Sequence, residues 1–317
     1  MKAMDYSTSQ EMSKRWGISL QDAISQIAAD IAFEIKMVEA CKDMSKVVNA
    51  HTEGEVYIDP SAGISSLVSY IVFEFGESDL RKAIKLSADM DLAMILRSLH
   101  GACVGLYQMH NKEIAHQDVK PSNIMLMDKA NPSSSKIADL GRIVPKNPSK
   151  FEIRDNPQHL GSIYAGDRNY SPPEIRYSHF DPDWKKRCIT CDLFQFGSVI
   201  CFSLTGTEMF ANILKYLDSG FSPGKVSYAD AVPYLQDAFS MAMDEFDKQM
   251  PDYLINAGLS RIVRELCNPN YLERGHPSDI TGRHYLPSLA RYHPRLDRLA
   301  VVAKLHVEGK SLPGELS

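Results

Sequence analysis

The sequence has few cysteines, no surplus of positive charge and no long uninterrupted apolar run. Its 6 cysteines are spread over 317 residues, too thinly for a disulfide scaffold. Lysine and arginine number 35 against 40 aspartates and glutamates, a net charge of −5, so we expect no nucleic acid partner. Polar residues interrupt the longest apolar stretches, Leu67–Phe75 and Leu193–Leu204. Both fall short of the roughly 20 residues that span a bilayer, so we expect no membrane partner.

The first ten residues, M-K-A-M-D-Y-S-T-S-Q, also lack the apolar segment of a secretory signal. A cytoplasmic location is therefore expected. The one C-x-x-C, Cys188 and Cys191, has no second pair at zinc-ribbon spacing and begins an apolar run, which favours buried thiols over a metal site. With 44% hydrophobic and 24% charged residues, the composition is that of a globular protein.

Apolar periodicity predicts one helix, then a small sheet, then a mainly helical remainder. Apolar residues recur at steps of three and four from Ser19 to Met44, which is typical of an amphipathic helix. Short β-branched and aromatic runs at 47–48, Val56–Ile58 and Tyr70–Phe75 indicate strands. A second helical stripe extends from Leu92 to His110.

The middle of the chain is more polar. Short strands alternate with polar loops between Ile114 and Leu140, and Pro145–Gly166 is expected to be a long loop. From Asp192 onward helical patterns dominate, and no internal repeat is visible.

One polar segment carries candidate chemistry. Residues 114–123 read I-A-H-Q-D-V-K-P-S-N, and Asp139 follows in A-D-L-G. Asp118, Lys120 and Asn123 place a proton acceptor, a cation and a metal-ligating amide on one loop, which is what phosphoryl transfer to a hydroxyl requires. Asp139, at the end of a β-run, supplies a carboxylate where Mg²⁺ could bridge phosphates. Each piece alone is a weak signal, but the ordered set predicts a phosphotransferase.

These motifs resemble those of the eukaryotic-type Ser/Thr protein kinases. His116–Asp118 stands where that family has H-R-D, Asp118–Asn123 matches D-x-K-P-x-N, and Asp139–Gly141 matches D-F-G. Downstream, Gly166–Glu174 resembles the end of the family's activation segment, and Asp192–Gly197, D-L-F-Q-F-G, resembles the D-x-W-S-x-G that opens its central helix.

The resemblance implies roles for four polar residues. Asp118 would be the catalytic base toward the substrate hydroxyl, and Lys120 would steady the transferred phosphoryl group. Asn123 and Asp139 would hold Mg²⁺. ATP and Mg²⁺ are the implied cofactors.

The resemblance also extends toward the N-terminus. Glu74 and Gly76 would belong to a hinge that binds adenine through its backbone, with Phe73 as the gatekeeper residue. Lys2 resembles the strand-three lysine of the family and Glu34 its helix-C partner, which together fix the α- and β-phosphates.

Two features near the N-terminus depart from the family pattern. The separation between Lys2 and Glu34 is long, so we expect an insertion around Trp16 and Gly17. Nothing precedes Lys2 that could form the family's Gly-rich loop, and no G-x-G-x-x-G occurs. We expect either an incomplete copy of a longer kinase or a kinase that has lost this loop.

Further departures lie in the catalytic motifs. Gln117 replaces the Arg that in many kinases pairs with a phosphorylated activation loop, so we expect no such switch. Asp167 replaces a Thr, and its carboxylate would repel that of Asp118 and raise the pKa of one of them. Arg274 stands where the family has an Arg that pairs with the Glu at the end of the activation segment. The resemblance therefore implies that Arg274 pairs with Glu174.

The sequence therefore predicts an α+β, protein kinase-like two-lobe fold. Residues 1–75 would form a partial N-lobe and residues 76–317 the C-lobe. The expected function is ATP- and Mg²⁺-dependent phosphoryl transfer to Ser/Thr hydroxyls of a protein substrate. The alternative is a kinase-like pseudoenzyme or nucleotide-binding scaffold. A small-molecule phosphotransferase of the aminoglycoside or choline type and a helical domain with chance motifs match the motifs less well.

Overall fold

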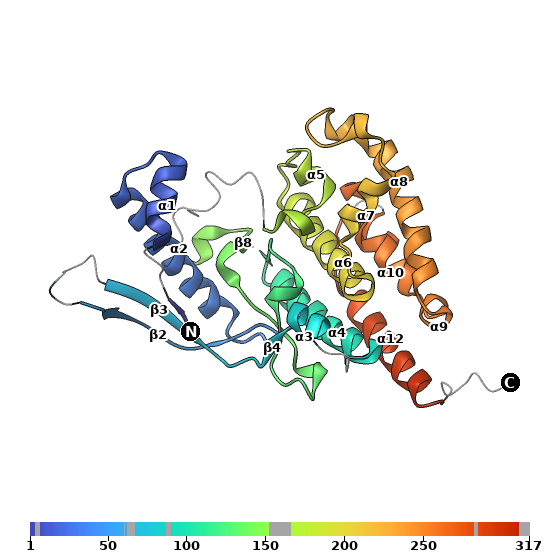
Figure 1. The fold of residues 1–317 in the computed structure, drawn as a ribbon, viewed down its shortest axis with the longest axis horizontal. Coiled ribbons are helices and arrows are strands. Elements are labelled where there is room, and N and C mark those ends of the chain that lie inside the picture. Colours follow the sequence, from blue (N-terminus) through green and yellow to red (C-terminus); the bar gives the residue numbers. More distant parts are fainter. Residues whose placement is uncertain are drawn as a thin grey trace.

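The computed structural model describes residues 1–3, 7–59, 61, 67–86, 90–151, 166–281 and 285–310. It has a small lobe that contains a sheet and two helices, and a larger lobe that is mainly helical (Figure 1).

Two helices cover the small lobe. The predicted amphipathic helix is α2 (Leu20–Cys41), and it begins where Ser19 accepts a hydrogen bond from the Asp22 N–H at 3.0 Å. A further helix, α1 (Ser7–Trp16), precedes it, and the two are joined through Gly17, whose φ of 66° suits glycine. The segment in which the sequence predicts an insertion thus contains helix α1, packed against α2.

The sheet of the small lobe has the strand order β1-β3-β2, with all pairs antiparallel. These strands are β1 (Lys2–Ala3), β2 (Ala50–Tyr57) and β3 (Leu67–Phe73). In this register Lys2 lies opposite Ile71, so the short strand β1 fixes the backbone of Lys2 beside the central strand.

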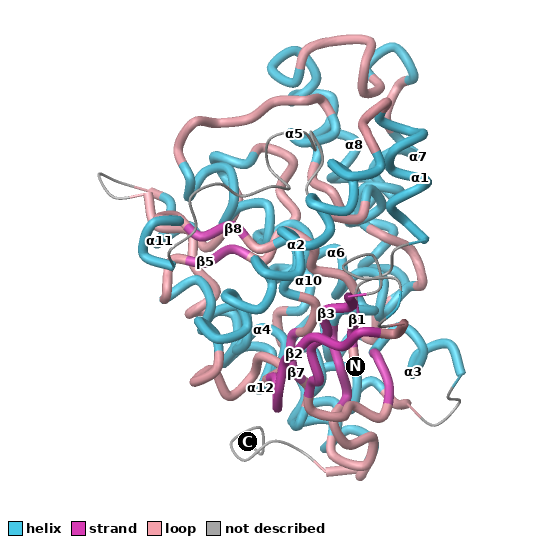
Figure 2. The backbone as a smooth tube through the Cα atoms, turned by 90° about the vertical axis from the view of Figure 1, so that its left-hand side faces the viewer, coloured by secondary structure: helices cyan, strands magenta, loops and turns pink. Residues whose placement is uncertain are grey.

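Further short strands form two separate small sheets (Figure 2). One sheet has the order β4-β6-β7, from Ser78–Asp79, Ile124–Leu126 and Lys136–Ile137, and a separate pair joins β5 (Ile114–Ala115) to β8 (Val144–Pro145). The Val48 N–H donates to the Ile137 carbonyl at 2.8 Å, and the Ile137 N–H donates to the Lys46 carbonyl at 2.8 Å. The segment after α2 is thus anchored to the larger lobe.

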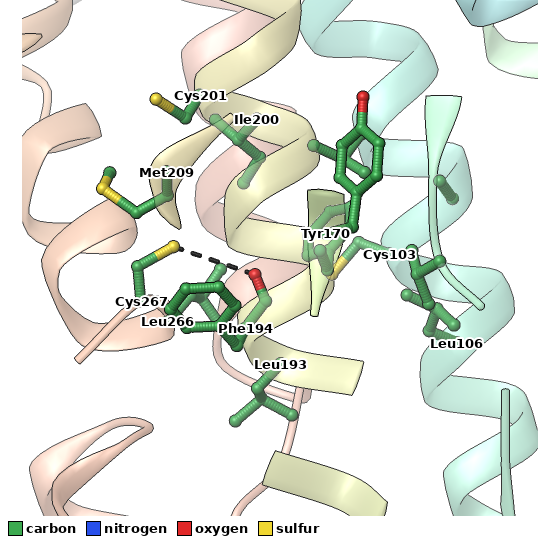
Figure 3. Close-up of a cluster of buried hydrophobic side chains, with 14 of the residues drawn as sticks. Cys103, Leu106, Tyr170, Leu193, Phe194, Ile200, Cys201, Met209, Leu266 and Cys267 are labelled. Atoms are coloured by element: carbon green, nitrogen blue, oxygen red, sulfur yellow. Dashed lines mark hydrogen bonds between the residues drawn. The ribbon is translucent and has the colours of Figure 1, made fainter. Parts of the chain in front are cut away.

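The larger lobe is built around α6, whose residues from Thr190 to Ser203 are all buried. Its side chains pack between those of α4 and α10, as the labelled Cys103, Phe194 and Leu266 show in Figure 3. The helices of this lobe are α3 (Leu80–Leu86), α4 (Leu92–Asn111), α5 (Pro173–Arg176), α6 (Thr190–Thr205), α7 (Met209–Tyr216), α8 (Tyr228–Gln249), α9 (Asp252–Asn256), α10 (Leu259–Leu266), α11 (Pro277–Ile280) and α12 (Tyr292–Val307).

The helical stretch Lys185–Thr205 is the one described segment long and apolar enough to cross a membrane, and 89% of its apolar window is buried inside the fold. This burial is that of a core helix. Cys188 and Cys191 lie in its first turns, both buried, and burial raises the pKa of Cys188 to about 12. Among the described residues no group of three or more His, Cys, Asp or Glu could hold a metal ion.

The predicted long loop is described only in part. It begins at the end of β8, and a 3-10 turn follows at Pro148–Phe151. Residues 152–165 lie outside the described residues.

Candidate active site

Residues 114–123 form the candidate catalytic loop. This loop surrounds the carboxylate of Asp118, which is 3% exposed. Its Oδ2 accepts hydrogen bonds from Lys120 Nζ at 2.8 Å and from Asn123 Nδ2 at 3.2 Å. The same Asn123 nitrogen also donates to the Asp118 carbonyl at 2.9 Å. A 3-10 turn at Pro121–Asn123 makes these contacts possible, because it folds the amide back over the loop. The three residues that the sequence groups within one loop therefore meet in space.

The strand pair β6–β7 brings Asn123 close to Asp139. Ile124 pairs with Ile137, so the residues just outside the pair face each other, and the Ala138 N–H donates to the Asn123 carbonyl at 2.9 Å. Asp139 follows directly, with a left-handed φ of 64° that turns the chain out of the strand.

His116 connects the catalytic loop to the segment that ends in Asp139. Its Nδ1 accepts a hydrogen bond from the Asp118 N–H at 3.2 Å. The ring proton is therefore on Nε2, which donates a hydrogen bond to the Ala138 carbonyl at 3.1 Å. This histidine is fully buried, and its two bonds fix the distance between the two loops.

Lys2 lies between two carboxylates. Its Nζ is 2.7 Å from Glu34 Oε2 and 3.1 Å from Asp139 Oδ1. A Cβ added at Gly141 would lie 3.4–3.6 Å from atoms of all three side chains, so the glycine backs directly onto this triad. The structure thus brings together two predicted site residues that are 32 positions apart in the sequence.

The charges of this triad shift one another's pKa values. Burial alone would lower the pKa of Lys2, but the neighbouring Asp139 and Glu34 outweigh it and raise that pKa. Burial raises the pKa of Glu34, against the effect of Lys2. For Asp139, burial would again raise the pKa, but the charge of Lys2 lowers it. Asp139 is therefore held as a carboxylate, the form that a divalent cation requires.

Asn123 and Asp139 fit the chemistry of a magnesium site. Both hydrogens of the Asn123 amide are directed at Asp118, which leaves its Oδ1 as the atom for a cation. The Asp139 side chain is 44% exposed, and only one of its oxygens contacts Lys2. Carboxylate and amide oxygens are hard ligands of the kind that Mg²⁺ prefers.

The predicted hinge follows β3. The Glu74 N–H donates to the Asn49 carbonyl at 2.9 Å, and the Glu74 carboxylate pairs with Lys136 at 2.7 Å. The side chain of Glu74 is therefore occupied behind the hinge. A Cβ at Gly76 would come within 2.7 Å of Met125 Cε, so the backbone passes close to β6 here, and Phe73 packs against the core.

Gln117 and Asp167 are two residues in the catalytic motifs that depart from the family pattern. Gln117 is 3% exposed and its Nε2 donates to the Cys188 carbonyl at 2.8 Å and to Asp192 Oδ1 at 3.0 Å. Its side chain therefore faces the core, and the absence of a phosphate switch stays a prediction. The repulsion expected between the carboxylates of Asp167 and Asp118 stays a prediction. The Asp167 side chain accepts from the Asn169 N–H at 3.0 Å, and what Asp118 receives from Asp167 is its backbone N–H, at 2.8 Å.

Side chains of helix α6 bind the backbone of the catalytic loop. The sequence did not predict these contacts. The Asp192 carboxylate accepts from the N–H groups of His116 and Gln117, both at 2.7 Å, and lies 2.9 Å from His110 Nε2. Gln195 also contacts the loop. The sequence feature that could have predicted this support is the pair of polar residues Asp192 and Gln195 inside an otherwise apolar helix, because a buried polar group needs hydrogen-bond partners.

Glu174 and Arg274 form the predicted ion pair. Arg274 Nη1 and Nη2 donate to the two carboxylate oxygens at 2.6 and 2.8 Å, and both side chains are buried. Burial alone would lower the pKa of Arg274, but Glu174 raises it. The pair ties the end of the activation segment to the segment that follows α10.

Gly166 is predicted to tolerate no side chain. A Cβ there would lie 2.4 Å from the Gln117 carbonyl and 2.6 Å from Asp118 Oδ1, at a φ of 67°. Gly166→Ala should destabilise the protein by more than the roughly 1–2 kcal/mol that left-handed backbone alone costs an alanine.

Gly206→Ala is the matched control, because Gly206 has a φ of 78° with open space around its Cβ position. Denaturant unfolding of both variants measures the difference. Equal losses of stability in the two variants would show that a Cβ at position 166 does not clash with the catalytic loop.

The arrangement defines a class of protein. Two lobes meet after β3, with a buried aspartate on one loop and a lysine–carboxylate triad beside it, an arrangement of the kind that protein kinase domains have. A family model described as the protein kinase domain matches residues 3–281, and the chain belongs to this family. The predicted α+β two-lobe fold is thereby confirmed.

Several mitogen-activated protein kinases of plants are similar to parts of this chain. A 153-residue stretch, 47% of the chain, is 30% identical to mitogen-activated protein kinase 16 of Arabidopsis thaliana and covers 24% of that protein. A 220-residue stretch, 68% of the chain, is 27% identical to mitogen-activated protein kinase 9 of Oryza sativa subsp. japonica and covers 29% of it. The chain thus spans less than a third of the length of these relatives.

Proposed function

We propose that this protein transfers the terminal phosphoryl group of ATP, with Mg²⁺, to Ser/Thr hydroxyls of a protein substrate. One observation carries the proposal: the catalytic loop around Asp118 and the triad of Lys2, Glu34 and Asp139 are both formed, and β6–β7 joins them. Residues 1–75 and 76–317 are proposed as the two lobes, with nucleotide between them.

Each proposed role follows from the contacts of the side chain. Asp118 has both oxygens engaged by N–H donors, which orient it to accept the hydrogen of a substrate hydroxyl. Lys120 is within 2.8 Å of that carboxylate and supplies positive charge where the phosphoryl group moves. Asn123 and Asp139 would hold Mg²⁺, which neutralises charge on the phosphates when it is bound.

Two further groups would position the nucleotide. Lys2, held by Glu34, is proposed to bind the α- and β-phosphates, since a paired lysine near Asp139 presents a fixed cation there. The backbone of Glu74 and Gly76 is proposed to bind adenine. The Glu74 carboxylate pairs with Lys136 and the Glu74 N–H donates to the Asn49 carbonyl, so the groups proposed for adenine are the carbonyl of Glu74 and the backbone of Gly76.

A transfer assay tests the function. The purified chain is incubated with Mg²⁺, γ-labelled ATP and a generic basic protein, and phosphoamino acids are identified afterwards. We expect label on serine or threonine. A thermal shift with Mg²⁺ and ATP but no transfer would favour the nucleotide-binding scaffold instead, and the absence of both would contradict a nucleotide site altogether.

Lys2→Met is predicted to lower kcat/KM for ATP by on the order of 100-fold, because it removes one preorganised donor from the phosphates. Lys42→Met is the matched control, since Lys42 also pairs with a glutamate of α2, Glu39, but both are exposed. Steady-state kinetics at varied ATP should leave the control unchanged. A normal rate for Lys2→Met would exclude Lys2 from the nucleotide site.

A further inference from the structure

Gln195 holds the backbone on both sides of Asp118. Its Oε1 accepts from the Val119 N–H at 2.9 Å, and its Nε2 donates to the Gln117 carbonyl at 3.1 Å. Gln195 is fully buried in the middle of α6. One amide side chain therefore bridges the two residues that flank the proposed base.

We infer that Gln195 is a positioning residue for Asp118, an inference that rests on the proposed function. Gln117 has a φ of 63°, a left-handed conformation that is unfavourable in a residue other than glycine and persists only where its surroundings enforce it. Gln195 and Asp192 together supply four hydrogen bonds to backbone atoms of residues 116–119. Helix α6, the buried centre of the lobe, thus fixes the conformation of the loop.

The role requires both ends of an amide. A glutamine offers a separate acceptor and donor, which match one N–H and one carbonyl group at the same time. The serine of the D-x-W-S-x-G pattern has a single oxygen in this place. Since Gln117 faces the core, the loop is tied to α6 through the Gln195 amide and the Asp192 carboxylate, in contacts that need no phosphate.

Loss of Gln195 would leave the Val119 N–H and the Gln117 carbonyl buried without these partners, which disfavours the present loop conformation. The Asp118 carboxylate would shift relative to Lys120. A displacement of about 1 Å in a reacting group lowers turnover on the order of 100-fold.

The test compares Gln195→Met with Ser198→Ala. Met keeps the length of the side chain and removes both hydrogen bonds. Ser198 is buried in the same helix and accepts from the Met209 N–H at 3.0 Å, away from the catalytic loop. We expect kcat of Gln195→Met to fall about 100-fold with an unchanged KM for ATP, whereas Ser198→Ala loses thermal stability alone.

Two results would separate positioning from general destabilisation. Adding Gln195→Met to Asp118→Asn should cause no further loss of rate, because both act through one carboxylate. A full additional 100-fold loss would overturn the inference, as would an equal fall of kcat in Ser198→Ala.

Amide hydrogen exchange tests the role of Gln195 without a measurement of enzyme activity. The Asp167 N–H donates to Asp118 Oδ1, so a displaced Asp118 should speed exchange in segment 166–171 as well as in 114–123 for Gln195→Met, and not for Ser198→Ala. Unchanged exchange in both segments would overturn the inference. A wild-type chain without phosphate transfer would contradict the proposed function, and this exchange comparison would still decide the role of Gln195.

Discussion

Asp118→Asn is expected to lower the rate of phosphate transfer about a thousandfold, the usual range for loss of a general base. The amide has the shape of the carboxylate, and its oxygen can still accept from the Asp167 N–H that lies 2.8 Å from Asp118 Oδ1. What is lost is the negative charge beside Lys120, together with the oxygen that accepts hydrogen bonds from Lys120 and Asn123. We therefore expect the rate to collapse and the melting temperature to fall as well, because two donors lose this acceptor.

Asp128→Asn is the control for this substitution. Asp128 is an exposed residue of the larger lobe, and its side chain accepts from the Ala130 N–H at 2.8 Å. The same change of chemistry there should leave turnover intact. A rate of Asp118→Asn within tenfold of the wild-type rate would remove Asp118 from the reaction and leave the kinase fold without its proposed base.

The largest loss of stability is expected from Arg274→Met. Breaking a buried ion pair from one side costs about 3–5 kcal/mol, because the remaining charge is left without compensation. Here Glu174 would remain buried at 3% exposure after losing two hydrogen bonds at 2.6 and 2.8 Å. Denaturant unfolding measures the loss directly.

Two further variants interpret this result. Arg295→Met removes one partner of Glu265, which also pairs with Arg261, and the lost pair is partly exposed, so the cost should stay below about 1 kcal/mol. The double variant Glu174→Gln/Arg274→Met should recover part of the lost stability, because no charge remains buried. A cost of less than 1 kcal/mol for Arg274→Met alone would contradict the pair's role in holding the activation segment.

Contacts within one loop were the most predictable part of the site. Asp118, Lys120 and Asn123 are at most five positions apart, so their spacing almost fixes their meeting once the chain turns at Pro121. The helices at Leu20–Cys41 and Leu92–Asn111 were equally readable, since each has an apolar stripe of helical period.

The extra helix α1 and the orientation of Asp167 were not readable in this way. The segment Ser7–Trp16 is polar, so the sequence indicated an insertion without its structure. Residue identity alone predicted repulsion at Asp167 and did not show that Asp118 accepts from the Asp167 N–H, while the Asp167 carboxylate accepts from the Asn169 N–H. Which group of a residue faces a site depends on backbone dihedral angles that the residue type does not specify.

The sequence by itself determined that this is a protein kinase domain, because short motifs with fixed spacing encode the catalytic loop and the segment around Asp139. Only the tertiary structure decided how that loop is held. The contact of Lys2 with Glu34 spans 32 positions, and that of Gln195 with Val119 spans 76. Such contacts form where a buried donor finds a buried acceptor after the helices have packed, and a linear pattern carries no record of that packing.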